Sequence, residues 1–237
     1  MELIVLISVV IFVSTFIQTV SGFGIALVAM PILTSAIGLG VASPLVALVA
    51  FATRIGILLR YHQAFSLRAV VPLVIASVIG VQFGGALLNL MDEHTMKVIL
   101  GLVIISYAVY ALFKLKLPAM AHSTWAYSMG FLSGVLAGAY NAGGPPVVIY
   151  ADCRGWNPDE FKSNLQGFAM FNSVTVLLNQ LMNGRFTPLV WQTFLLTIPA
   201  AAIGLWLGIY ADKLVNGERF RTVVLVLLLA LGVQLLF

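Results

Sequence analysis

The sequence predicts an all-α polytopic membrane protein of two homologous, inverted repeats, with about eight transmembrane helices and broken or re-entrant segments. Two observations predict this fold. Only 8% of the 237 residues are Asp, Glu, Lys or Arg, whereas a soluble domain needs roughly 25% to cover its surface. In addition, glycine motifs of the same spacing recur in the two halves of the chain. The composition excludes a soluble enzyme.

Stretches without a charged residue mark the membrane-spanning segments. They are 3–53, 69–91, 98–113, 117–151, 163–184, 186–211 and 222–237. A spanning helix needs about 20 apolar residues, so the two longest stretches hold more than one helix. Gly and Pro interrupt the first of them at 21–24, at Pro31 and at 38–44, and the second at 141–146. Because backbone groups freed at Gly and Pro must be satisfied inside the membrane, these positions predict broken helices or hairpins.

The two halves of the chain align at an offset of 124 residues. Gly80 and Gly84 then match Gly204 and Gly208 (204 − 80 = 124), and both closing spans end together. The breaks at 21–24 and 141–146 follow in the same order with a small shift of register. We predict one integral membrane domain made of a first repeat at 1–114, a linker at 115–119 and a second repeat at 120–237. Paired interruptions of this kind indicate a transporter binding site.

The basic residues favour inverted repeats in a cell inner (cytoplasmic) membrane. If each half contains a hairpin and three further spans, nine basic residues share one side and two lie on the other, whereas a parallel arrangement divides them five to six. The positive-inside rule selects the first division, with both termini outside. It also accounts for the net charge of +4 without a nucleic-acid partner. The nine are Arg60, Arg68, Lys114, Lys116, Arg154, Lys162, Lys213, Arg219 and Arg221, and the two are Lys97 and Arg185.

The two breaks are the strongest candidates for a substrate site. Pro145 and Pro146 suit the first turn of a helix, which places the N–H groups of the preceding residues at a helix N-terminus. Such a terminus binds anions without a formal charge. The alternative is a close helix crossing that requires small residues. The expected substrate contacts here are Ser21, Gly22, Phe23, Gly24, Asn141, Ala142, Gly143, Gly144 and Pro145.

A polar stripe follows one side of the predicted span 161–182. Asn172 and Asn179 lie on one line of this helix, and Gln166, Ser173 and Gln180 lie on the adjacent line. Amides buried in lipid are costly unless they are partnered, so the stripe should face other helices or an aqueous cavity. Asn172 and Asn179 therefore either bind substrate or join helices.

Two charged residues are further candidates. Arg54 is the basic residue well inside an apolar span. It either extends toward the membrane surface or faces a cavity and attracts an anion. Asp152 is a candidate for proton coupling. Cys153 is the single cysteine, which excludes a disulfide and a multi-cysteine metal site. We expect no metal and no cofactor. We also expect no catalytic residue, because no predicted span holds a His or carboxylate that could activate Ser133.

The chain resembles the TauE/SafE sulfite-exporter-like family of membrane anion permeases. The resemblance rests on Gly22-Phe23-Gly24 with Pro31, and on Gly143-Gly144-Pro145-Pro146 followed by an apolar run and Arg154-Gly155-Trp156. It implies a secondary transporter that moves a small sulfur-containing or organic anion, such as sulfite or an organosulfonate, across the cytoplasmic membrane by alternating access. A passive anion channel and a structural membrane subunit are the alternatives.

Overall fold

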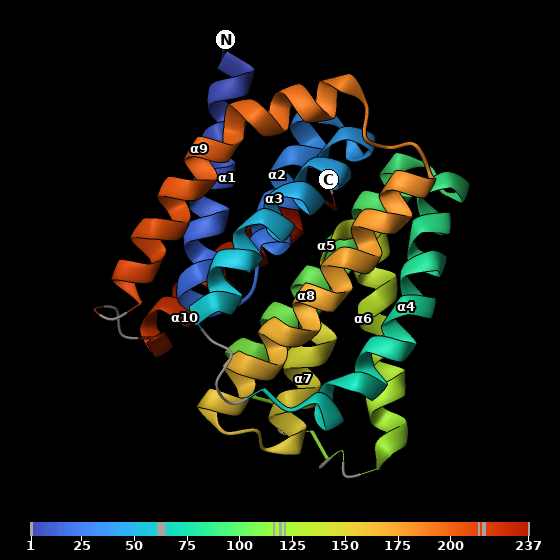
Figure 1. The fold of residues 1–237 in the computed structure, drawn as a ribbon, viewed down its shortest axis with the longest axis vertical. Helices are drawn as coiled ribbons and strands as arrows, with labels where there is room; N and C mark the ends of the chain where they lie inside the picture. The colour runs from blue at the N-terminus through green and yellow to red at the C-terminus, as the bar shows by residue number, and fades with distance from the viewer. Residues whose placement is uncertain are drawn as a thin grey trace. The chain divides into compact units, whose positions relative to one another are not determined.

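The computed structural model describes residues 2–60, 65–115, 117–118, 120, 122–212, 214 and 217–236, and over these residues every regular element is an α-helix (Figure 1). Five helices, namely α1, α4, α5, α9 and residues 39–57 of α3, are long and apolar enough to cross a membrane. The all-α membrane fold is thus confirmed, and the count of about eight spans stays a prediction. The helices are α1 (Glu2–Ser21), α2 (Ile25–Ile37), α3 (Leu39–Arg60), α4 (Leu67–Leu90), α5 (Glu93–Leu112), α6 (Ser123–Tyr140), α7 (Gly144–Arg154), α8 (Pro158–Met182), α9 (Pro188–Ala211) and α10 (Gly217–Gln234).

Both predicted breaks fall between helices. The first separates α1 from α2, and the second separates α6 from α7. Gly22 (φ 83°) ends α1 and Asn141 (φ 57°) ends α6, each in the left-handed conformation. Glycine and asparagine adopt this conformation more readily than other residues do. The two breaks therefore use the same backbone device.

The other predicted interruptions are only partly correct. Gly38 (φ 74°) separates α2 from α3, but Pro31 lies inside α2 and Pro44 inside α3. A proline removes one helical hydrogen bond, and in a membrane helix the freed carbonyl is satisfied by neighbouring groups, so the helix continues.

The helices form two compact units. Unit 1 comprises Met1–Thr53, Met91–Lys116 and Arg185–Phe237, and unit 2 comprises Arg54–Leu90 and Leu117–Gly184. Each unit combines helices from both predicted repeats, since α9 packs on α1 in unit 1 and α4 packs on α6 in unit 2. The division into repeats stays a prediction, and Lys116 and Ala119 of its linker lie outside the described residues, as does Lys213.

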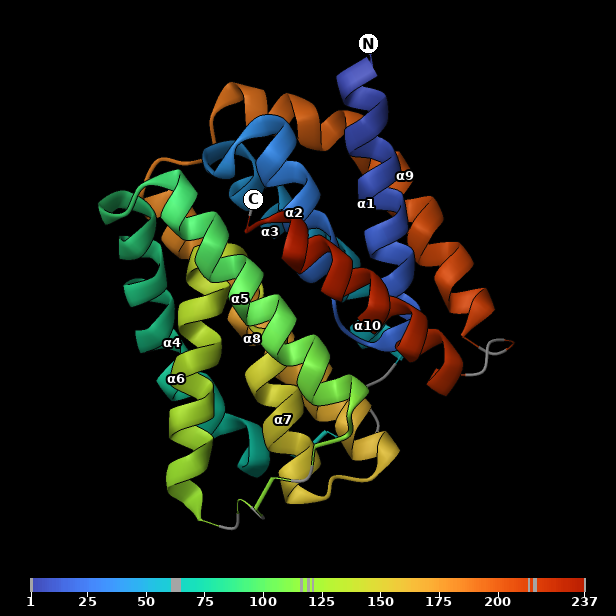
Figure 2. The same ribbon diagram turned by 180° about the vertical axis from the view of Figure 1, so that it is seen from behind.

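Glycines allow α4 and α6 to pack in unit 2 with their backbones in contact. A Cβ atom on Gly84 of α4 would lie 2.0 Å from the carbonyl oxygen of Val135, and one on Gly138 of α6 would lie 2.3 Å from that of Val81. No larger side chain fits at these positions. Close approach of this kind is a main source of helix association in membranes. Both ribbon views show α4 running beside α6 (Figures 1 and 2).

The aligned glycines make contacts of the same kind in unit 1. A Cβ atom on Gly204 of α9 would lie 2.6 Å from the carbonyl oxygen of Phe12, and one on Gly208 would lie 2.6 Å from the Cβ of Thr19. The glycine pair of α4 therefore contacts α6, and that of α9 contacts α1, so each pair packs against a helix of the other predicted repeat.

Gly84→Leu should lower the free energy of unfolding by about 3 kcal/mol, because the new side chain must push the α4 and α6 backbones apart. Thermal unfolding of the detergent-purified protein measures this. Gly40→Ala is the control, since no atom lies within 4 Å of the new Cβ, and it should leave the melting temperature unchanged or slightly higher. Equal melting temperatures for wild type and Gly84→Leu would contradict the packing described.

Candidate functional site

The second break begins with a helix cap that occupies one expected donor. The N–H of Asn141 donates to the carbonyl oxygen of Ala137 at 2.8 Å, and the N–H of Ala142 donates to that of Leu136 at 3.2 Å. This is the hydrogen-bond pattern by which a left-handed residue ends a helix. The prediction that Ala142 presents a free N–H is therefore wrong, because the cap consumes it.

The N-terminus of α7 leaves two donors available. Pro145 and Pro146 stand in its first turn, as predicted, and carry no N–H. Among the described residues, the N–H groups of Gly143 and Gly144 have no acceptor. The hydroxyl of Ser133 on α6 donates to the carbonyl oxygen of Gly143, which fixes this peptide. Two unpaired N–H groups thus lie at the positive end of the α7 dipole.

Asn172 brings a third donor to the same place. This side chain is 7% exposed, and its Oδ1 accepts a hydrogen bond from the hydroxyl of Ser77 on α4 at 2.7 Å. Its Nδ2 would lie 2.9 Å from a Cβ atom on Gly143. No acceptor for Nδ2 occurs among the described residues. The amide group of Asn172 is therefore held by its oxygen, with its hydrogens beside the N-terminus of α7.

The rest of the polar stripe is buried, as predicted. Gln166, Ser173, Asn179 and Gln180 are each at most 5% exposed. The Nδ2 of Asn179 donates to Oε1 of Gln82 on α4 at 2.8 Å. Asn179 therefore joins α8 to α4, whereas Asn172 has donor capacity to spare.

Arg54 places a positive charge on α8. Its Nη1 donates to the carbonyl oxygen of Ala169 at 3.1 Å and to the hydroxyl of Ser173. Both partners are neutral. The guanidinium is therefore turned toward α8, and its charge is available to an anion.

The first break, in unit 1, uses most of its polar groups locally. The hydroxyl of Ser21 donates to the carbonyl oxygens of Ile17 and Phe23, and the N–H of Gly22 donates to that of Gln18. The ring of Phe23 packs edge-on against Tyr107 with centroids 5.8 Å apart. Gly24 (φ 109°) precedes α2, whose first turn supplies a second helix N-terminus. Because the two breaks belong to different units, their joint use of one substrate stays a prediction.

Asp152 is set apart from the donors of unit 2. It is exposed and lies in the last turn of α7, eight residues or about 12 Å along the axis from Gly144. A role in proton coupling stays a prediction. Among the described residues, no group of three or more His, Cys, Asp or Glu could hold a metal ion.

Ser77 and Ser133 are the site residues that the sequence did not reveal. Ser133 is fully buried on α6, and its hydroxyl donates to the carbonyl oxygen of Gly143 and so holds this peptide. Ser77 lies one helical turn before Gly80, on the side of α4 that contacts α6 and α8. Its spacing from Gly80 is the sequence feature that could have identified Ser77 as a residue at the helix contact.

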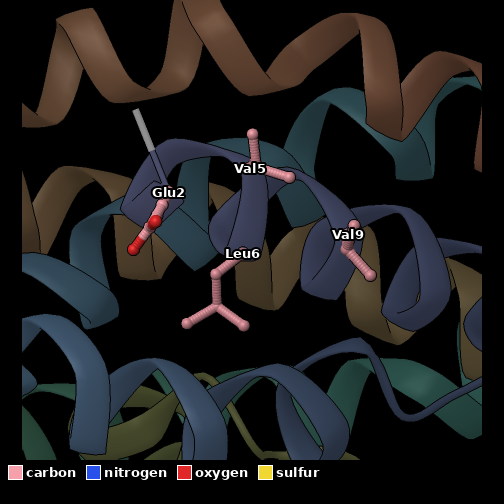
Figure 3. Close-up of a pocket in the computed structure, with 4 residues that line it drawn as sticks. All are labelled: Glu2, Val5, Leu6 and Val9. Atoms are coloured by element: carbon pink, nitrogen blue, oxygen red, sulfur yellow. The ribbon is translucent and has the colours of Figure 1, made fainter.

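A surface hollow on α1 is distinct from these groups. Glu2, Val5, Leu6 and Val9 line it (Figure 3). The three apolar side chains are each at least 43% exposed, which suits contact with lipid. The hollow offers one carboxylate and no cationic side chain, so it has no chemistry for an anion.

Apolar helices interrupted at a site of buried hydrogen-bond donors are typical of a membrane transporter. The family model of the sulfite exporter TauE/SafE matches residues 6–235, so the chain belongs to the TauE/SafE family. This family consists of transporters rather than enzymes and implies a membrane sulfite or anion exporter. Comparison with curated proteins and with solved structures gave no match.

Asn141→Gly should keep the second break intact, whereas Asn141→Ala should lower the free energy of unfolding by about 1 kcal/mol, because alanine resists a positive φ. Melting temperatures of the two variants in detergent check this. Higher stability of the alanine variant would mean that the left-handed cap does not determine the break.

Proposed function

We propose that the protein is a secondary transporter that moves a small sulfur-containing or organic anion, such as sulfite or an organosulfonate, across the cytoplasmic membrane by alternating access. The observation that carries this proposal is the unpaired Nδ2 of Asn172 beside the unpaired N–H groups of Gly143 and Gly144. Three donors without an acceptor, on the buried residues Asn172 and Gly143 and the half-buried Gly144, fit the oxygen atoms of an anion.

The chemistry of these donors suits transport better than permanent binding. The N–H groups and the amide are neutral, and Arg54 of α3 supplies charge at the surface of α8, the helix that carries Asn172. Neutral donors compensate an anion's lost hydration without trapping it as an ion pair. The anion can therefore be captured and released.

The first break also contributes to anion binding in this proposal. Its contribution is the N-terminus of α2 after Gly24, since Ser21 and Phe23 are engaged locally. Inverted repeats allow one half to move against the other and expose the site to either side of the membrane in turn.

Asn172→Asp should reduce sulfite transport at least about tenfold, because a carboxylate can still accept the Ser77 hydrogen bond but repels an anion. Asn179→Asp is the matched control on the same helix, with the same change seven residues away. The measurement is uptake of radiolabelled sulfite into proteoliposomes that contain equal amounts of correctly folded variant. Equal loss in both variants, or in neither, would refute the assignment of Asn172.

Arg54→Gln should raise the KM for sulfite about tenfold while changing the maximal rate less, since a fixed charge mainly aids capture. Arg54→Lys should recover part of the loss. Arg68→Gln removes the same charge from an exposed position and should behave as wild type. An unchanged KM in Arg54→Gln would exclude this arginine from the anion site.

Counterflow separates a carrier from a channel. Sulfite loaded inside proteoliposomes should accelerate entry of labelled sulfite if each turnover exchanges one anion across the site. Flux that rises linearly with concentration and shows no acceleration would instead indicate a passive anion channel.

A further inference from the structure

α1 carries a cluster of buried polar atoms that lack partners. Ser14 and Thr15 are 0% exposed and Gln18 is 2% exposed. Both hydroxyl oxygens, and both Oε1 and Nε2 of Gln18, have no hydrogen bond. Buried polar atoms are nearly always paired in folded proteins, so four unpaired atoms within five residues indicate a ligand.

The three side chains lie together on the buried side of α1. Ser14 and Gln18 are four residues apart, so they are neighbours on one line of the helix. That line continues the buried residues Ile7 and Ile11, one helical repeat of seven residues earlier. Thr15 is adjacent, on the side toward α9, where its Cβ would lie 3.3 Å from a Cβ on Gly204. Within unit 1, α1 is packed by α2, α9 and α10 (Figure 2).

The electrostatic setting favours a cation. Gln18 lies in the last turn of α1, at the negative end of the helix dipole, and no basic residue occupies that turn. α2 and α9 contain no charged residue, and the charged residue of α1 is Glu2, at the far end. On α10, Phe220 packs against Phe16 of α1, which points about 160° away from Gln18 around the helix axis. This ring contact places Phe220 on the side of α1 away from Gln18, and the next residue, Arg221, has a buried Nε without a hydrogen-bond partner.

We propose that Ser14, Thr15 and Gln18 form a binding site for a monovalent alkali cation such as Na⁺. The two hydroxyl oxygens and Oε1 of Gln18 are hard, neutral ligands, and the set contains no carboxylate. Divalent cations such as Ca²⁺ and Mg²⁺ are held by carboxylates, so the charge of the set matches a single positive charge. The set also contains no titratable group and therefore cannot bind a proton instead.

The corresponding place in the second half lacks the site. An offset of 119 residues aligns the two left-handed residues that end α1 and α6 (141 − 22 = 119). With this offset Ser14 matches Ser133, Thr15 matches Gly134 and Gln18 matches Ala137. Ser133 already donates to Gly143, and the other two residues have no side-chain oxygen. The proposed cation site therefore belongs to the end of α1 and is not repeated at the end of α6.

This cation extends the proposed anion transport and rests on it only for coupling. The site lies at the carboxyl end of α1, just before the break, whereas the proposed anion contact of unit 1 is at the amino end of α2, just after it. Opposite ends of helix dipoles bind opposite charges. Occupation of one place then favours occupation of the other.

Thermal unfolding in detergent at constant ionic strength tests the cation site without any sulfur anion. Replacing choline chloride by NaCl should raise the melting temperature of wild type in a saturable manner, because a ligand that binds the folded state stabilises it. Thr15→Val and Gln18→Leu should weaken the apparent Na⁺ affinity by more than about tenfold. Thr19→Val is the matched control on α1, since its buried hydroxyl already donates to the carbonyl oxygen of Thr15, and it should keep the wild-type response.

The comparison without Na⁺ shows that a lost response is not misfolding. In choline alone, Gln18→Leu should melt at or above the wild-type temperature, because it removes two unpaired buried atoms. The proposal is overturned if Li⁺, Na⁺, K⁺ and choline give equal melting temperatures, as expected for a site filled by water. It is also overturned if Thr15→Val and Thr19→Val respond alike. Sulfite added at fixed Na⁺ tests the anion site separately, so either proposal can fail while the other stands.

Discussion

The contact between the backbones of α4 and α6 is the constraint on which the second break depends. It exists because Gly80, Gly84 and Gly138 leave no side chain between the two helices. From this contact, Ser77 of α4 reaches Asn172, and Ser133 of α6 reaches the peptide of Gly143. Both sides of the N-terminus of α7 are thus fixed by hydroxyl groups on helices that glycine holds together.

The protein manages charge by keeping it out of the interior almost entirely. Arg54 brings a charge to a helix interface, where its guanidinium is anchored to neutral oxygens of α8 rather than to a carboxylate. A carboxylate would have neutralised the charge and competed with any anion. The remaining donors of the proposed site are neutral, so in this proposal its preference for anions comes from helix ends and from Arg54. This explains how a chain with 8% charged residues can serve a charged substrate.

The positions of the breaks could be predicted from the sequence, because a left-handed turn needs Gly or Asn and a helix start tolerates Pro. The burial of the α8 stripe followed in the same way from its helical spacing. Partnerships could not be predicted. Tertiary packing decides these hydrogen bonds. They are the bond from the N–H of Ala142 to Leu136, the bond from Ser77 to Asn172 and the bond from Asn179 to Gln82. The predicted helix breaks at Pro31 and Pro44 were wrong for a related reason, since neighbouring groups decide whether a proline ends a membrane helix.

The consecutive prolines of α7 limit how much of an anion this end of the helix can hold. A first turn without N–H groups at Pro145 and Pro146 leaves Gly143 and Gly144 as the backbone donors. With the amide of Asn172 added, the donors are too few for the lone pairs of three oxygen atoms. An anion held here would keep part of its hydrogen-bonding capacity for water or for another helix. The protein would then satisfy only part of the anion's hydrogen-bonding capacity, and this lowers the free-energy cost of releasing the anion.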